Sequence, residues 1–201
     1  MREERLRQKI GVRELARRVG VSASLISQVE LGKASPSVGT LYAIAGELRL
    51  SLDELLFVPT ASRPTRHRQA ESGAAIDPVV RRGSGKSIQL ASGVRWERLT
   101  PQTPQDVDFL YVIYDAGGAS SPEDSLMRHS GTEYGHVLNG RLGVTIGFET
   151  YELGPGDSIS FESTMPHRLF TVGEEPVEAI WFVVGRRGDP LIGLGSASST
   201  S

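Results

Sequence analysis

The hydrophobic pattern of this chain changes once, near residue 57, from the period of a helix to the period of short strands. Before this point, apolar residues recur every three or four positions, as they do on one face of a helix. After residue 87, short apolar runs recur every eight to twelve residues between Gly, Pro and Asp, which is typical of a sandwich or barrel. The 201 residues are therefore predicted to form one all-α module and one all-β module.

This change of pattern divides the chain into four segments. The stretch after the helical part has prolines, small polar residues and no apolar periodicity, which is typical of a linker. The C-terminal end is rich in Gly and Ser, and we expect it to be disordered. The expected segments are a helical domain at 1–57, a linker at 58–73, an all-β domain at 74–186 and a disordered tail at 187–201.

Charge is divided unequally between the two halves. Residues 1–68 carry 12 Lys and Arg against 7 Asp and Glu, a net charge of +5. Residues 69–201 carry 10 against 17, a net charge of −7. A basic module joined to an acidic one indicates that the first approaches a polyanion such as DNA, although many charged surfaces have no such partner.

The chain contains no cysteine. Disulfides, thiolate nucleophiles and cysteine-ligated zinc or iron–sulfur sites are therefore excluded, and a reducing compartment fits this composition. The first residues, MREERLRQK, lack the apolar stretch of a signal peptide, and the longest apolar runs are too short to span a bilayer. We expect a cytoplasmic protein with no membrane partner.

Two short helices joined by a glycine turn are predicted between residues 12 and 30. The first covers Val12–Val19 and ends at Gly20, which suits a left-handed C′ position. Ser22 suits the N-cap of the second, because its hydroxyl can accept a backbone N–H. Two such helices form a helix-turn-helix. The outer face of the second helix carries small or amide side chains with no core to bury them: Ala23, Ser24, Ser27 and Gln28.

Two more helices are expected to complete the helical domain. Ser37 suits the N-cap of one that runs through Leu48. Residues 51–54, SLDE, have the sequence of a capping box and begin another. A helical bundle that binds only protein would show the same pattern, so the helices alone leave that alternative open.

The stretch of residues 11–56, GVRELARRVGVSASLISQVELGKASPSVGTLYAIAGELRLSLDELL, resembles the XRE (lambda-repressor-like) helix-turn-helix family along almost its whole length. In that family the second helix of the motif enters the major groove with its N-terminal residues near the base edges. Gln28 can there present a bidentate amide to adenine. By position, the resemblance implies that the residues facing the groove are Ala23, Ser24, Ser27 and Gln28.

The same resemblance implies contacts to the DNA backbone. Arg13, Ser22 and Lys33 occupy positions that would hold phosphates and fix the register of the domain on the duplex. Glu30 matches an acidic position whose role in the family is structural. The resemblance thus implies a double-stranded DNA operator as partner.

Two turns are predicted within the all-β module. Asn139-Gly140 lies between the segments HVL and RLGVTI, and both residues tolerate positive φ, which is the strongest short signal for a hairpin. Gly154-Pro155-Gly156-Asp157 predicts a second tight turn. We therefore expect the strands on either side of Asn139-Gly140 to pair.

Three residues of this module could carry metal chemistry. His129 and Glu133 lie four residues apart, and His167 follows the second turn in the sequence Met-Pro-His. Two neutral imidazoles and a carboxylate from neighbouring strands can form a facial triad with open positions for water or substrate. The alternative is three polar residues that hydrogen-bond to one another at the mouth of a barrel, and spacing alone favours that alternative.

Residues 127–170, MRHSGTEYGHVLNGRLGVTIGFETYELGPGDSISFESTMPHRLF, resemble the cupin family of small β-barrels, or jelly rolls. The family motifs read HxH…E…G and PGD…PH, and most of their residues are present. The first histidine of HxH falls on Met127, so that a site of four ligands is reduced to His129, Glu133 and His167. The chain is thus expected to join an all-α N-terminal helix-turn-helix bundle to an all-β C-terminal cupin.

The resemblance to cupins leaves two functions open. In many regulators of this two-domain type the barrel has lost its metal and binds a small-molecule effector, and the pocket here would comprise Met127, His129, Glu133 and His167. The other is an iron enzyme, because hydroxypropylphosphonate epoxidases have the same domain order and hold iron with two His and one Glu. No residues that would bind a phosphonate can be matched, so the regulator is favoured, with no catalytic residue and no cofactor beyond a divalent metal.

We expect the regulator to act as a symmetric dimer and as a repressor. Repressor-type helix-turn-helix domains usually read two half-sites about 34 Å apart. The cupin domains, through strands rich in Val, Ile and Phe, would supply the two-fold interface. Effector binding in the barrel would change the placement of the two DNA-binding domains.

Overall fold

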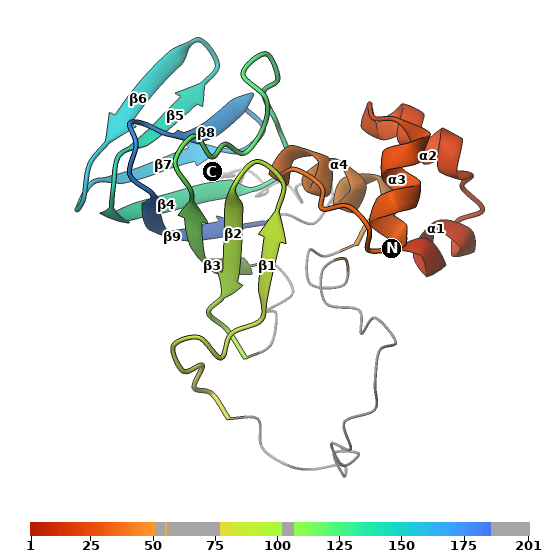
Figure 1. Ribbon diagram of the computed structural model, residues 1–201, viewed down its shortest axis with the longest axis horizontal. Helices are drawn as coiled ribbons and strands as arrows, with labels where there is room; N and C mark the ends of the chain where they lie inside the picture. The colour runs from red at the N-terminus through yellow and green to blue at the C-terminus, as the bar shows by residue number, and fades with distance from the viewer. Residues whose placement is uncertain (51–54, 56–76, 102–106, 186–201) are drawn as a thin grey trace, which may run out of the picture.

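Within its described residues, the computed structural model has four helices, α1 to α4, followed by two β-sheets (Figure 1). Both predicted modules are thus confirmed as an all-α part and an all-β part. No helix within the described residues is long and apolar enough to cross a membrane. The structure describes residues 1–50, 55, 77–101 and 107–185, so the expected linker at 58–73, the capping box at 51–54 and the tail at 187–201 lie outside the described residues.

The three capping residues predicted from the sequence lie at the ends of helices. Gly20 ends the first predicted helix in the left-handed region at φ 79°. The Ser22 hydroxyl accepts a hydrogen bond from the Leu25 N–H at 3.1 Å, and the Ser37 hydroxyl accepts one from the Thr40 N–H at 3.2 Å. A short N-terminal helix was not singled out by the sequence. The helices between residues 1 and 50 are α1 (Arg2–Arg7), α2 (Val12–Val19), α3 (Ala23–Glu30) and α4 (Val38–Leu48).

A buried ion pair joins α1 to the end of α3. The guanidinium of Arg5 donates to both carboxylate oxygens of Glu30, at 2.8 and 2.9 Å, and also to the Ile10 carbonyl at 2.8 Å. The two charged side chains are only 6% and 5% exposed, so each charge depends on the other for its solvation. Glu30 therefore has a structural role here, as the resemblance to the XRE family implied.

We expect Glu30→Gln to destabilise the helical domain by about 3 kcal/mol, because it leaves the Arg5 guanidinium buried without its counter-charge. Urea unfolding followed by circular dichroism measures the loss. The matched control is Glu14→Gln, which removes an exposed carboxylate paired with Arg17 and Arg18, and it should leave the midpoint unchanged. Equal losses in the two variants would contradict the structural role of the Arg5–Glu30 pair.

The described part of the all-β module, residues 77–101 and 107–185, forms two antiparallel sheets. One has six strands in the order β1-β2-β3-β9-β4-β7, and the other has three in the order β6-β5-β8. The predicted segment at 87–99 is split into two strands by a turn through Ser92 and Gly93, both with φ 66°. The strands are β1 (Ser87–Leu90), β2 (Val94–Arg98), β3 (Val107–Tyr114), β4 (Thr132–Asn139), β5 (Leu142–Ile146), β6 (Glu149–Leu153), β7 (Ser158–Glu162), β8 (His167–Thr171) and β9 (Val177–Val184).

The prediction of a hairpin at Asn139-Gly140 was wrong. Gly140 has the positive φ that was expected, 76°, but β4 pairs with β7 and β9, whereas β5 pairs with β6 and β8. The turn therefore carries the chain from one sheet to the other. A side chain at 140 would lie 2.3 Å from the Pro176 carbonyl oxygen, so the close approach of these two segments also requires a glycine. The tight turn at Gly154–Asp157 is confirmed by its hydrogen bond from the Asp157 N–H to the Gly154 carbonyl, at 3.1 Å.

The two sheets pack face to face, and α4 covers one end of the core between them (Figure 1). Leu142 and Leu169 from the small sheet join Val112 and Trp181 from the large sheet in one buried cluster. Alternation along β4 sends Glu133, Gly135 and Val137 inward and the residues between them outward. The carboxylate of Glu133 thus enters the interior of the barrel.

Candidate functional site

Two histidines and a glutamate from opposite sheets meet inside the barrel. His129 precedes β4, Glu133 is the second residue of β4, and His167 opens β8 in the other sheet. The Nε2 atoms of His129 and His167 lie 2.9 and 3.1 Å from the same carboxylate oxygen, Glu133 Oε1. The side chains of His129, Glu133 and His167 are 8%, 2% and 0% exposed. The structure thus brings together the three residues that the sequence proposed as a metal site.

Hydrogen bonds behind the site fix how these side chains point. The Nδ1 atoms of His129 and His167 lie 3.0 and 2.8 Å from the carbonyl oxygens of Ser130 and Met165. A carbonyl oxygen can only accept, so each Nδ1 carries the hydrogen and each neutral imidazole presents a lone pair at Nε2. Such hydrogen bonds from the far ring nitrogen are typical of metal-binding histidines.

The carboxylate of Glu133 is held in the same way. The indole Nε1–H of Trp181 donates to Glu133 Oε2 at 2.7 Å, which leaves Oε1 to face the two imidazoles. Burial alone would raise the pKa of the Glu133 carboxyl, but the neighbouring His129 and His167 side chains more than offset this effect and bring the pKa down to about 2. A buried carboxylate that stays ionised needs a positive counter-charge close to it.

The donor set fits a divalent cation. His129 Nε2, His167 Nε2 and Glu133 Oε1 are buried and make no hydrogen bond of good geometry, although they lie close together. Neighbouring ligands of an octahedral site with bonds near 2.1 Å are about 3.0 Å apart, which the two Glu–His separations match. Two imidazoles and one carboxylate suit a transition metal and leave coordination positions open.

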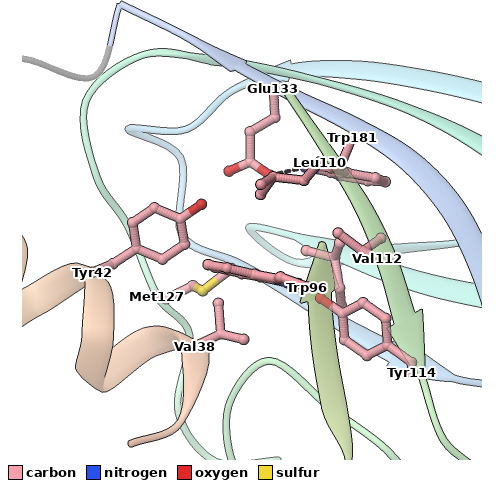
Figure 2. Close-up of a pocket in the computed structure, with 10 residues that line it drawn as sticks. Val38, Tyr42, Trp96, Leu110, Val112, Tyr114, Met127, Glu133 and Trp181 are labelled. Carbon is pink, nitrogen blue, oxygen red and sulfur yellow. Dashed lines mark hydrogen bonds between the residues drawn. The ribbon is translucent and has the colours of Figure 1, made fainter. Parts of the chain in front are cut away.

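Met127 stands beside the site without joining it. Its backbone exchanges two hydrogen bonds with that of His167, at 2.8 and 2.9 Å, so the substituted motif position keeps its place in the fold. Its side chain is buried and lies against the pocket that borders the site (Figure 2). Among the described residues, the cluster able to hold a metal comprises the other three side chains.

The pocket next to Glu133 is narrow and is lined by aromatic and aliphatic side chains (Figure 2). It leaves about 10 Å³ for the centre of a water molecule, which is room for about one water. Burial raises the pKa of the Tyr114 phenol, with the nearby Glu133 charge adding to the effect, so this hydroxyl is neutral. The lining residues are Val38, Tyr42, Trp96, Leu110, Val112, Tyr114, Met127, Glu133, Leu169 and Trp181.

Two residues that are central to this pocket, Trp181 and Tyr42, were not assigned to it from the sequence. Trp181 was not placed because the strand parity of most aromatic residues was unknown, and Tyr42 was not considered because it lies in the helical domain. A signal for Trp181 was present in Gly135, since a side chain there would lie 2.0 Å from the indole ring. Gly135 therefore makes the space that Trp181 needs to reach Glu133.

We expect Gly135→Ala to destabilise the protein by about 2–3 kcal/mol, because the added methyl group displaces the Trp181 ring in a packed core. Urea unfolding measures the loss, and tryptophan emission reports the displaced ring. Gly46→Ala is the matched control, because a Cβ at that exposed helical position meets nothing within 4 Å and should stabilise by up to about 1 kcal/mol. A neutral Gly135→Ala would contradict the tight fit.

The residues expected to bind DNA lie on and around α3. Ser24 and Gln28 are one helical turn apart on the outer face of this helix, with half-buried Ser27 between them. Ala23 packs against the core of the helical domain, which leaves it less of a groove-facing surface than expected. The side chains expected at phosphates are Arg13, Ser22 and Lys33, and they lie at the start of α2, at the N-cap of α3 and just beyond its end.

Models of two protein families match this chain. A helix-turn-helix model matches residues 1–55, and a cupin domain model matches residues 110–183. The helix-turn-helix-type transcriptional regulator PuuR of Escherichia coli is 27% identical over 166 residues, 82% of each chain. The regulator SutR of the same organism is 25% identical over 177 residues, 87% of each chain.

A solved structure shares the fold of the whole chain. The crystal structure of an HTH_3 family transcriptional regulator from Vibrio cholerae covers 91% of both chains with a TM-score of 0.61 and 20% identity. At that identity the likeness concerns the fold alone. It includes both the helical part and the barrel, in the same order along the chain.

Proposed function

Since the chain belongs to the XRE-type helix-turn-helix regulators that carry a C-terminal cupin domain, we propose that it binds a specific DNA operator and regulates transcription in response to a ligand in the barrel. The observation that carries the DNA-binding part is the α2–turn–α3 unit, whose outer face presents Ser24 and Gln28. Helices in this arrangement place the second one in the major groove.

Selection from fragmented genomic DNA tests this function. The full chain is mixed with the fragments at physiological salt and excess nonspecific competitor, and the retained fragments are sequenced. We expect a small set of fragments that share one motif, with two half-sites about one helical turn apart. Retention of fragments without a common motif at any salt concentration would contradict a sequence-specific regulator.

We further propose that the protein acts as a homodimer through its barrel. The outer face of the six-stranded sheet carries Phe109, Phe182 and Tyr134 directly opposite one another on three neighbouring strands. Phe109 and Phe182 stack at 4.2 Å, and Tyr134 is 47% exposed. An apolar surface of this kind is suited to a second copy. Light scattering on the purified chain should give twice the monomer mass, and Phe182→Glu should halve it.

For the sensing part, we propose that His129, Glu133 and His167 hold a divalent cation and that an effector binds beside it. The convergence of three buried acceptor atoms without a hydrogen between them supports the cation. Elemental analysis of protein purified without chelators should find about one transition metal per chain. Repressor rather than activator action stays a prediction, to be checked by transcript levels in a deletion strain.

A second candidate function is an iron-dependent oxygenase or epoxidase. The observation in its favour is the same set of two histidines and one glutamate, because a metal held by three protein groups keeps positions for a substrate and an oxidant. The regulator relatives favour ligand sensing instead. Turnover of oxygen by iron-loaded protein with a reductant, absent in Glu133→Gln, would establish the enzyme.

A further inference from the structure

Helix α4 belongs to two cores at once. Ile44 and Leu48 are buried in the core of the helical domain. On another face of the same helix, Val38, Tyr42 and Ala45 are buried in the core of the barrel. Figure 1 shows α4 between the other helices and the sheets. The helix is therefore both a structural part of the DNA-binding domain and the cover of the barrel.

Backbone hydrogen bonds join the start of this helix to the barrel. The Gly39 N–H donates to the Ser120 carbonyl at 3.1 Å, and the Ala91 N–H donates to the Pro36 carbonyl at 3.0 Å. A Cβ atom at Gly39 would lie in ordinary contact with the Cβ atoms of Ser121 and Met127, at 3.7 and 3.5 Å. The helix and the barrel are thus in direct contact along this edge.

Tyr42 carries the contact into the site itself. Its ring stacks on His129 with centroids 4.0 Å apart and planes 12° from parallel, and it meets the edge of Trp96 at 5.8 Å. Figure 2 shows the Tyr42 side chain reaching from α4 across the pocket toward Glu133. A residue of the DNA-binding domain therefore forms a wall of the proposed ligand pocket and touches a proposed metal ligand.

The pocket is too small for an organic molecule while α4 is in place. It has room for about one water, whereas pockets for small organic ligands have volumes of at least about 300 Å³. The other walls are packed strands of both sheets and Met127, whose backbone is bridged to His167 of β8, whereas Val38 and Tyr42 come from a helix outside the sheets. A movement of α4 would therefore enlarge the pocket and leave the barrel itself intact.

We propose that α4 is the lid of the barrel pocket, so that an organic effector enters only when α4 leaves the barrel and frees the DNA-binding domain. This inference rests on the proposed sensing function. A ligand that binds only the undocked state shifts the population toward it, and the two DNA-binding domains of a dimer then lose their fixed placement. The three donor atoms already lie close together under the docked helix, so we expect the metal alone to leave α4 in place.

A disulfide between Gly39→Cys and Ser121→Cys would lock the lid. The expected Cβ–Cβ distance of 3.7 Å lies in the range of about 3.5–4.5 Å that disulfides adopt, and the chain has no other cysteine. Gly39→Ser with Ser121→Cys is the matched control, because it has similar packing but forms no intramolecular disulfide. Each protein is compared before and after treatment with a phosphine reductant.

Hydrogen exchange followed by NMR tests the lid without any ligand. The amides of residue 39 and Ala91 should exchange at one common rate in the reduced double variant, at least about tenfold faster than in its oxidised form. The control should show no effect of the reductant. Exchange as slow as that of the His167 amide inside the barrel, or equal rates in both redox states, would overturn the proposal.

Entry of an organic molecule is tested with Co²⁺ and imidazole as probes. Both redox forms should bind Co²⁺ with the same stoichiometry, whereas imidazole should change the visible Co²⁺ spectrum in the reduced form alone. Imidazole binding in the oxidised form, or in neither form, would overturn the lid. Absence of a Co²⁺ spectrum would refute the metal site, and absence of operator binding would refute the regulator. In both cases the hydrogen-exchange experiment still tests whether α4 acts as a lid.

Discussion

Glu133→Gln is expected to abolish metal binding by the barrel. The substitution keeps the size of the side chain and leaves an amide oxygen to accept the hydrogen bond from Trp181, but it removes the charged ligand atom between His129 and His167. Loss of one ligand from a set of three should weaken binding more than about 100-fold, since even changes behind a metal ligand cost about 10- to 100-fold. Isothermal titration with Mn²⁺ or Ni²⁺, together with elemental analysis, measures the change.

The control for this prediction is His136→Gln. His136 is an exposed histidine on the same strand, β4, and its Nδ1 lies 2.9 Å from the Ser158 hydroxyl on the outer face. Its replacement should leave the metal content at about one per chain. Equal metal content in Glu133→Gln and the parent protein would show that the cation is held elsewhere.

Thermal unfolding separates metal loss from misfolding. In the metal-free parent protein three acceptor atoms converge, whereas the amide group that Glu133→Gln introduces can donate to one imidazole. The metal-free variant should therefore be at least as stable as the metal-free parent. Added metal should raise the unfolding temperature of the parent and leave that of Glu133→Gln unchanged, because ligand binding to the folded state alone stabilises it.

Local capping and strand patterns were sufficient to predict most of the fold. Gly20, Ser22 and Ser37 act through backbone groups two to four residues away, and their effects do not depend on distant parts of the chain. Asn139-Gly140 shows the limit of such reasoning. Positive φ was correctly predicted at Gly140, but which strands pair depends on how two sheets pack, and a dipeptide contains no information on that.

The three residues of the candidate metal site were proposed from the sequence because they match the motifs of the cupin family, whereas their spacing alone did not favour a metal site. The role of α4 as a lid was not predicted, because this helix has apolar residues on two faces and its sequence does not show what covers the second face. Tyr42 meets His129 although 87 positions separate them, and no local pattern connects the two. The pocket thus depends on long-range packing, whereas its polar side chains belong to a short motif.

Gln28→Ala is expected to weaken binding to the specific operator by about 5- to 150-fold, or about 1–3 kcal/mol. The amide of Gln28 projects from α3 and can both donate to and accept from one adenine edge, which alanine cannot do. Binding to unrelated DNA should be unchanged, because that binding depends on phosphate contacts. Fluorescence anisotropy with operator and scrambled duplexes measures both affinities, and Gln89→Ala on the barrel surface is the matched control.

Lys33→Ala should weaken binding to all DNA sequences, whereas Gln28→Ala should weaken binding to the operator alone. Lys33 is an exposed cation just beyond α3, so its loss should weaken binding to operator and scrambled DNA by similar factors and reduce the slope of affinity against salt by about 1. The two variants together separate base reading from phosphate binding on neighbouring parts of one motif. If Gln28→Ala instead weakened both duplexes equally with a smaller salt slope, Gln28 would contact the backbone, and the sequence would have to be read by Ser24 and Ser27 or through the shape of the DNA.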